Sequence, residues 1–385
     1  TGGQIMPPIM GAAAFLMAEY MGVTYGQVTL WAILPAVLYF GGIFISVHLE
    51  AKKLGLKGIP RSELPRFKYL IRNVYLLLPL VFLIWMVTAN IRSLQFSAAI
   101  AILISIAVSL VGTICDASAE VRETKTGSVA GITAKKTGRM ILDSLEAGGK
   151  GSITVAVACA MAGMIAGCIT VTGLASKLIS GVIAISSAIP NPTLSLLLAL
   201  FLTMLCCIVL GMGVPTTANY CIMASTCAPI LITLGIPKVA AHFFVFYFGI
   251  VADITPPVAL AAYAGSAIAK SNPMKTGINA TKLAIAAFIV PFIFAYNPQM
   301  LFENVTSVFQ VVQIVITALL GIFAVAAGLE GYILRKMGWP LRVLAVIGGL
   351  TLLIPGTVSD LIGLVIVAAI IALQLLQNKR ERSEV

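Results

Sequence analysis

The chain has 385 residues, of which 59% are hydrophobic and only 10% are charged. Soluble globular proteins carry roughly 45–50% apolar and about 25% charged residues, so this composition excludes that class. The net charge of +11 does not indicate a nucleic-acid-binding protein, because the basic residues gather in loops between apolar runs without an RNA-binding motif. We therefore predict an all-α polytopic membrane protein that contacts the lipid bilayer and no nucleic acid.

In chain order, an irregular opening precedes an expected helix over about 8–21, and an apolar span is expected over about 25–47. A basic loop leads to two spans separated by a short turn at 90–95. The polar stretch 116–152 contains charges beside apolar positions at 135–146, which predicts a short amphipathic helix on the membrane surface. A separate span is expected over about 153–172.

The second half alternates apolar runs with glycine and proline breaks. The run 194–210 leads into "GMGVPTTANY", and the run 242–251 is interrupted by "ADITPP" before a helix expected over about 257–269. A further span ends near Tyr296, and the tail holds an apolar run at 305–327 and a hairpin split at 355–356.

Basic residues in the loops near 52–72, 116–152, 270–282 and 335–342 predict that these loops face the cytoplasm. The neutral loop at 297–298 is then expected on the opposite side. This topology is consistent only if the segments around "GMGVPTT" and "ADITPP" are broken helices or re-entrant hairpins.

Two distant stretches repeat one pattern, "TGGQIMPPIMGAAAFLMAE" and "GIVADITPPVALAAYAGSAIA". In both, a polar approach leads to a proline pair and then to a helix of small residues, so that Pro7-Pro8 matches Pro256-Pro257. Irregular, proline-interrupted apolar segments in corresponding places indicate a transporter built from inverted repeats, with the binding site at the broken helices.

Backbone N–H and C=O groups of a broken helix are tolerated at membrane depth only where they are buried or line a wet cavity. Such carbonyls can hold Na⁺, and helix N-termini can hold a carboxylate. Side-chain oxygens follow the "GMGVP" break at Thr216, Thr217 and Asn219, and the second proline pair has Asp253 and Thr255. An ionisable residue at this depth is costly, so Asp253 is a functional candidate.

The alternative interpretation is structural, because glycine and proline are common in transmembrane helices and a single break is more often a kink. Three breaks with clustered hydroxyls and an acid favour a transport site. An enzyme is not expected, since serines and histidines show no pairing with acids in an exposed segment.

The stretches "TGGQIMPPIMGAAAFLMAEYMG", "LGMGVPTTANY" and "HFFVFYFGIVADITPPVALAAYAGSAIA" resemble the large membrane subunit of tripartite ATP-independent periplasmic (TRAP) transporters. With "PFIFAYNP" included, the resemblance is nearest to the TAXI-type fused permeases and covers about 1–298. The tail resembles the extra C-terminal helices of the fused members.

The resemblance implies a multi-pass secondary transporter of the bacterial inner membrane, with an ion-transporter-like fold and an elevator-type movement. It implies Na⁺-coupled uptake of an organic acid, commonly a dicarboxylate, with Na⁺ as the coupling ion and no organic cofactor. The implied partners are a periplasmic substrate-binding protein and a small membrane subunit, either fused upstream or separate.

The resemblance also divides the chain. Residues 1–22 would be the second arm of a first helical hairpin, 23–190 membrane helices with the amphipathic segment, 191–300 a second repeat with a broken helix and a second hairpin, and 301–385 additional C-terminal membrane helices. The expected substrate contacts are Gly3, Pro7, Pro8, Thr217, Asn219, Asp253 and Pro257. The expected Na⁺ contacts, largely through main-chain carbonyls, are Gly2, Gly211, Gly213, Thr216, Thr255 and Pro256.

The helices that such a subunit carries before "TGGQIMPP" are not in this sequence, so we expect either a fragment of a longer product or a split partner. Two alternatives stay open on the sequence alone. One is a stand-alone carboxylate/ion symporter that needs no binding protein, and the other is a non-transporting membrane scaffold or channel-like subunit.

Overall fold

The computed structural model describes residues 2–7, 10–64, 71, 74–88, 94–124, 128–256, 259–303, 305, 307–353 and 357–383. The expected split at 355–356 and most of the expected turn at 90–95 lie outside these residues, as do Thr1, Pro8 and Pro257. Within the described part the chain is helical throughout, and the β contact found there is a single bridge between Tyr332 and Lys336.

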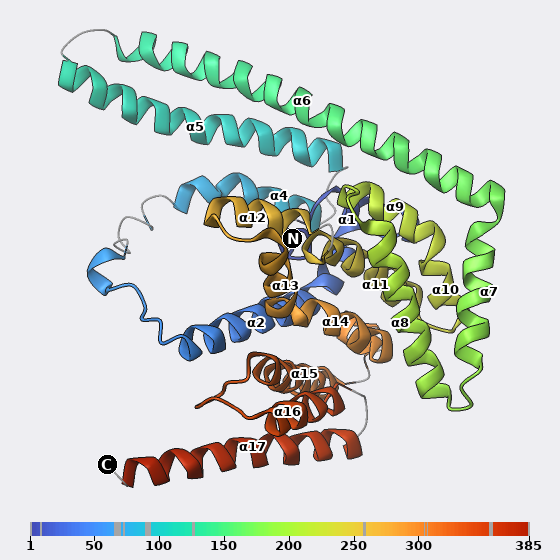
Figure 1. Ribbon diagram of the computed structural model, residues 1–385. Coiled ribbons are helices and arrows are strands. Elements are labelled where there is room, and N and C mark those ends of the chain that lie inside the picture. The colour runs from blue at the N-terminus through green and yellow to red at the C-terminus, as the bar shows by residue number, and fades with distance from the viewer. Residues whose placement is uncertain are drawn as a thin grey trace. The chain divides into compact units, whose positions relative to one another are not determined.

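The chain divides into two compact units, formed by 1–23, 28–57 and 159–385 and by 24–27 and 58–158. The first unit holds the elements that bear on function, drawn in Figure 1. They are η1 (Gly2–Gln4), α1 (Ala12–Met21), α2 (Tyr25–Lys53), α7 (Leu174–Ser187), α8 (Pro192–Gly211), α9 (Thr216–Thr226), α10 (Ala228–Thr233), α11 (Lys238–Val251), η4 (Ala252–Ile254), α12 (Leu260–Ala269), α13 (Pro273–Leu283), α14 (Ile285–Tyr296), η5 (Pro298–Leu301), α15 (Val308–Glu330), α16 (Trp339–Thr351) and α17 (Thr357–Ser383).

Six helical segments in the described residues are long and apolar enough to cross a membrane. They are Tyr25–Lys53, Phe96–Cys115, Pro192–Gly211, Pro273–Tyr296, Val308–Glu330 and Val358–Leu376. A span needs about 20 apolar residues, so these segments confirm the prediction of an all-α polytopic membrane protein.

Helix α11 is the centre of the first unit, because every side chain from Val239 to Val251 is buried. A helix that is apolar all round has to be covered on all sides, and α1, α8, α9, α10, α14 and η4 pack against it. Two polar contacts fix its neighbours. The Tyr220 hydroxyl on α9 lies 2.8 Å from Nδ1 of His242, and Lys238 Nζ donates to the Met21 carbonyl at the end of α1.

The second unit holds η2 (Arg61–Glu63), η3 (Val74–Leu77), α4 (Leu78–Thr88), α5 (Leu94–Thr124) and the first part of α6 (Val129–Thr172). The sequence predicted a short amphipathic helix at 135–146 and a separate span at about 153–172. This separation is wrong, because both segments lie in the continuous helix α6. The glycines at 148–151 do not end the helix, because Lys150 pairs with Glu146 across them and Ser152 Oγ donates to the Gly148 carbonyl.

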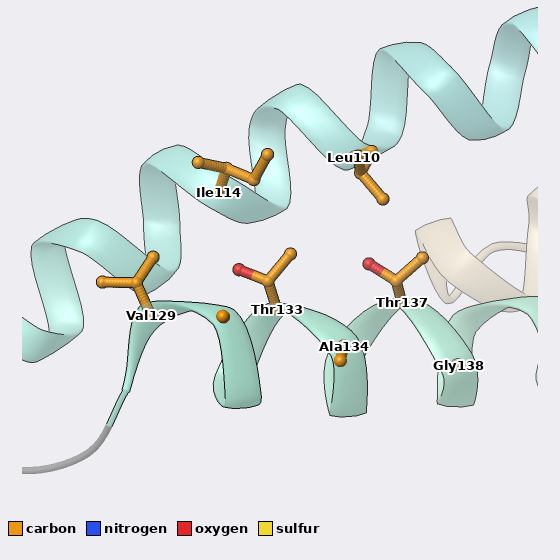
Figure 2. Close-up of a pocket in the computed structure, with 8 residues that line it drawn as sticks. Leu110, Ile114, Val129, Thr133, Ala134, Thr137 and Gly138 are labelled. Atoms are coloured by element: carbon orange, nitrogen blue, oxygen red, sulfur yellow. The ribbon is translucent and has the colours of Figure 1, made fainter.

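An apolar groove of about 630 Å³ runs between α5 and α6 in the second unit. Figure 2 shows Leu110 and Ile114 of α5 above Thr133 and Thr137 of α6, which line it together with smaller side chains. The groove contains none of the predicted substrate or ion contacts, so it does not coincide with the site predicted from the sequence.

Candidate functional site at the helix breaks

The two proline-paired segments have the same local backbone geometry. When Pro7 is matched to Pro256, the 3-10 turn η1 aligns with η4 to within one residue, and α1 aligns with α12 in the same way. The amide of Met10 donates to the Met6 carbonyl at 3.3 Å, and the amide of Ala259, at the matching position, donates to Thr255 at 3.1 Å. The sequence repeat is therefore also a repeat of backbone structure.

Both helices begin later than the sequence predicted. Helix α1 starts at Ala12 rather than near residue 8, and α12 starts at Leu260 rather than near 257. The backbone before each start is not helical, with φ of +21° at Met10 and +9° at Ala259. At the described positions Met10, Gly11 and Ala259 the main-chain groups therefore lie outside a regular helix.

The third break lies between α8 and α9. Helix α8 ends at Gly211, and Gly213 has a φ of +75°, a left-handed conformation that favours glycine. Helix α9 starts after Pro215 without a side-chain cap, so its first amides have no helical acceptor. Thr216 and Thr217 are half-buried in this first turn of α9.

Asn219 joins the start of α9 to α11 in the protein interior. Its side chain is fully buried, and Nδ2 donates to the Gly249 carbonyl of α11 at 3.0 Å. A Cβ placed on Gly211 would lie 2.5 Å from Asn219 Nδ2 and 2.9 Å from Cβ of Ala252. The end of α8, the first turns of α9 and the end of α11 therefore meet in direct contact.

The η4 segment follows α11 directly and packs against α8, α12 and α13. It is held by two hydroxyls, since Thr255 Oγ1 donates to the Val251 carbonyl at 2.7 Å and Thr281 Oγ1 of α13 donates to the Ile254 carbonyl at 2.9 Å. Asp253 is half-buried in this turn, as is Pro256 beyond it. The structure thus brings Asp253 and Thr255 to the same end of α11 as Gly211 and Asn219.

The first proline-paired segment packs against a different helix from the second. A Cβ on Gly2 would meet the rings of Phe40 and Tyr39 of α2 at 2.7 and 2.9 Å, so η1 lies tightly on α2. Gly3 is exposed and Pro7 is half-buried. Helix α1 packs on α9 and α11, with the Tyr20 ring edge-on to that of Tyr220. This segment therefore shares α9 and α11 with the other two breaks through α1, while η1 itself packs on α2.

Three buried oxygens in this region have no hydrogen-bond partner among the described residues, the Tyr247 hydroxyl on α11 and two amide carbonyl oxygens, Oδ1 of Asn219 and Oε1 of Gln4. The two carbonyl oxygens lie beside the breaks. A buried polar atom without a partner costs about 1–3 kcal/mol and calls for an explanation such as a bound ion or water. Both of the amide oxygens are neutral carbonyl oxygens beside a helix break, Gln4 at the end of η1 and Asn219 in the first turns of α9, and this type of ligand suits Na⁺.

Sequence reasoning missed Gln4, Gly249 and Thr281. Gln4 occupies the position that matches Asp253 when the proline pairs are aligned, so comparing "QIMPP" with "DITPP" residue by residue gives a signal for it. Gly249 and Thr281 act through contacts with residues 30 and 27 positions away, at Asn219 and Ile254. No local pattern in the sequence indicates such contacts.

Comparison with known proteins adds one match. A family model described as "Tripartite ATP-independent periplasmic transporter, DctM component" matches residues 1–311. Searches of curated proteins and of solved structures gave no match. The matched residues include all three breaks, whereas most of α15 and all of α16 and α17 lie beyond them.

Proposed function

Because the chain belongs to the DctM component family of tripartite ATP-independent periplasmic transporters, we propose that it couples inward movement of Na⁺ to uptake of an organic carboxylate. It is a multi-pass membrane permease of a transporter family rather than of an enzyme family. We place it in the bacterial inner membrane, where a periplasmic binding protein delivers the substrate and a small membrane subunit completes the assembly. The elevator-type movement and the likeness to TAXI-type fused permeases are part of the same proposal.

The observation that carries the Na⁺ part is the unpartnered Asn219 Oδ1, fully buried where α8, α9 and α11 meet. In this proposal Asn219 contributes its side-chain oxygen, and Gly211, Gly213 and Thr216 contribute main-chain or hydroxyl oxygens. The remaining expected Na⁺ contacts are Gly2 in the first proline-paired segment, and Thr255 and Pro256 in the second. Non-helical carbonyls are the groups that coordinate Na⁺ in transporters with broken helices.

The uncapped start of α9 supports a carboxylate substrate. Its first amides carry the positive end of the helix dipole and have neither a helical nor a side-chain acceptor. Thr217 lies in this first turn, and the proline-paired segments would supply the remaining contacts, which are Gly3, Pro7, Pro8, Asp253 and Pro257. The charge of the substrate would thus be recognised chiefly by backbone.

Uptake by the purified transporter in proteoliposomes tests the proposal. With the binding protein and small subunit present, we expect uptake of a labelled dicarboxylate to require an inward Na⁺ gradient and to stop when K⁺ replaces Na⁺. Uptake that ignores both Na⁺ and the binding protein would overturn it. Na⁺-dependent uptake without the binding protein would indicate the stand-alone symporter. If no combination of components gives uptake, the result would indicate the scaffold or channel-like subunit.

Asp253→Asn tests the acid of the second segment. Because Asp253 is half-buried at the end of α11, loss of its charge is expected to reduce the uptake rate at least tenfold in the same assay. The matched control is Asp143→Asn on α6, which removes an exposed carboxylate 4.0 Å from Arg139. Exposed pairs contribute little, so this control should keep its rate. Equal rates for both variants and the unmodified transporter would assign Asp253 to packing.

A further inference from the structure

A cluster of four charged side chains, of which Glu330 is buried and the other three are partly exposed, lies outside the site described above. Glu330, at the end of α15, is only 3% exposed, and its Oε2 lies 2.6 Å from Lys282 Nζ of α13 and 3.9 Å from Lys53 Nζ of α2. Lys53 also pairs with Glu50 at 2.9 Å. The cluster balances two acids with two bases and joins three helices that are far apart in the sequence.

The Glu330–Lys282 ion pair holds its two side chains together strongly, because the carboxylate of Glu330 is shielded from water. Removing Lys282 would leave the buried charge of Glu330 without its nearest counter-ion, which is strongly unfavourable in a site shielded from water. Lys282 is therefore constrained to stay beside Glu330. The Lys53–Glu50 pair is about one-third exposed on both sides and contributes much less.

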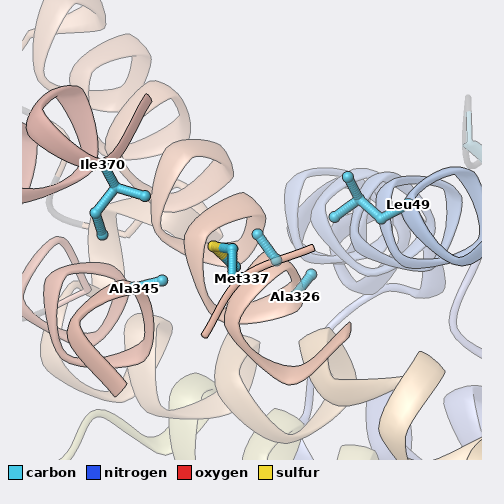
Figure 3. Packing of buried hydrophobic residues seen from close by; sticks show 6 residues of the cluster. Leu49, Ala326, Met337, Ala345 and Ile370 are labelled. Atoms are coloured by element: carbon cyan, nitrogen blue, oxygen red, sulfur yellow. The ribbon is translucent and has the colours of Figure 1, made fainter. Parts of the chain in front are cut away.

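Glu330 itself stands on a rigid support. Figure 3 shows an apolar cluster in which Leu49 of α2 approaches Ala326 of α15, with Met337, Ala345 and Ile370 packed around it. Leu49 is next to Glu50, and Ala326 is about one helical turn from Glu330. Arg342 strengthens the same end of α15 by donating to the Gly328 and Leu329 carbonyls at 2.9 and 2.8 Å. The acid is thus fixed by packing that involves α2, α15, α16 and α17.

Helix α13 connects this support to the helix breaks. Thr281, the residue before Lys282, donates its hydroxyl to the Ile254 carbonyl of η4 at 2.9 Å. Successive residues of a helix point about 100° apart, so Thr281 and Lys282 can hold two different elements at once. One turn of α13 is therefore tied to the Asp253 segment on one side and to Glu330 on the other.

We infer that Glu330 is a positioning residue for the "ADITPP" segment and acts through Lys282 and Thr281. This inference rests on the proposed function, because it assigns the segment a role in transport. Glu330 lies beyond the residues that the DctM family model matches. The C-terminal helices therefore set the geometry of an ion and substrate site to which they contribute no contact of their own.

The first test measures uptake as a function of Na⁺ in the reconstituted transporter. We expect Glu330→Gln to raise the Na⁺ concentration for half-maximal uptake at least fivefold, while the maximal rate changes less than twofold. The reason is that a displaced "ADITPP" segment moves the main-chain carbonyls proposed to bind Na⁺. This displacement lowers the affinity for Na⁺ more than it lowers the maximal rate. Glu146→Gln is the matched control, since it removes an exposed acid of α6 that pairs with Lys150 and is not a member of the cluster, and it should leave both values unchanged. A lower maximal rate with an unchanged Na⁺ requirement would overturn the inference.

The second test does not depend on transport. Hydrogen exchange of the amides at 253–255 in the purified, intact chain is expected to quicken at least tenfold in Glu330→Gln and in Thr281→Val, but not in Glu146→Gln. The double variant Lys282→Met/Glu330→Gln removes both charges of the pair, so it should fold normally and still show the faster exchange. If exchange quickens in Thr281→Val but not in Glu330→Gln, the inference is overturned. If uptake proves independent of Na⁺ while exchange follows this pattern, the proposed function fails and the positioning role stands.

Discussion

Gly211→Ala is expected to reduce uptake at least tenfold and to lower thermal stability. The added Cβ would lie 2.5 Å from Asn219 Nδ2, 2.9 Å from Cβ of Ala252 and 3.1 Å from Cε of Met223. Two of these neighbours come closer than any real Cβ contact allows, so α8, α9 or η4 has to shift. Overpacking a well-packed interior typically costs about 1–3 kcal/mol. The measurements are dicarboxylate uptake in proteoliposomes and the unfolding temperature in detergent.

Gly181→Ala is the matched control for this substitution. Gly181 lies inside α7, where an added Cβ meets no atom within 4 Å. Alanine favours a helix interior by about 1 kcal/mol over glycine, so the control should retain uptake and be equally or more stable. If Gly211→Ala transports as well as Gly181→Ala does, the close approach at the end of α8 has no part in transport.

Asn219→Ala is expected to abolish Na⁺-dependent uptake while the chain still inserts and folds. The substitution removes the donor to the Gly249 carbonyl and also the buried Oδ1 that we propose as an ion ligand. Leaving the carbonyl unpaired costs about 1–3 kcal/mol, which accounts for a modest loss of stability. A complete loss of uptake with only a modest loss of stability would show that Asn219 acts as an ion ligand, and not only as the donor to the Gly249 carbonyl.

Two comparisons sharpen this result. Asn219→Asp keeps an oxygen at the site but no longer donates to the carbonyl, so we expect it to bind Na⁺ while transporting slowly. Asn279→Ala changes an exposed asparagine of α13 and should leave uptake as it is. The measurement is Na⁺-induced thermal stabilisation alongside uptake, because an ion that binds only the folded chain raises its unfolding temperature. Equal Na⁺ stabilisation of Asn219→Ala and the unmodified chain would remove Asn219 from the ion site.

Much of the fold could be predicted because the membrane imposes strong rules on composition. Apolar runs near 20 residues predicted most of the spans, and both ends of α8, the start of α2 and the end of α1 lie close to the expected positions. Helix α2, however, continues to Lys53 instead of ending near residue 47. Proline and glycine were less reliable as markers. Pro35 and Pro291 lie inside α2 and α14, and the glycines at 148–151 lie inside α6, because neighbouring turns satisfy the backbone there.

The repeated "QIMPP" and "DITPP" segments were visible in the sequence because proline acts on its own backbone. Their matching hydrogen bonds, from Met10 to Met6 and from Ala259 to Thr255, follow from that local constraint. The break at 211–215 was visible for the same reason. Among the candidates, Pro7, Gly213 and Thr255 lie outside regular helix, whereas Thr216, Thr217 and Asn219 lie in the first turns of α9. Their functional roles stay predictions, and their tertiary contacts were not predictable.

That this is a helical membrane protein, and which segments interrupt its helices, could be read from the sequence, because both depend on composition and on local backbone chemistry. Which interruptions lie in contact with one another emerged from the packing of the folded chain. It placed Gly211, Asn219 and Gly249 in contact, left η1 packed on α2, and linked η4 through Thr281 and Lys282 to Glu330. These choices depend on side chains up to 48 positions apart meeting in a packed interior, and no local pattern encodes such a meeting.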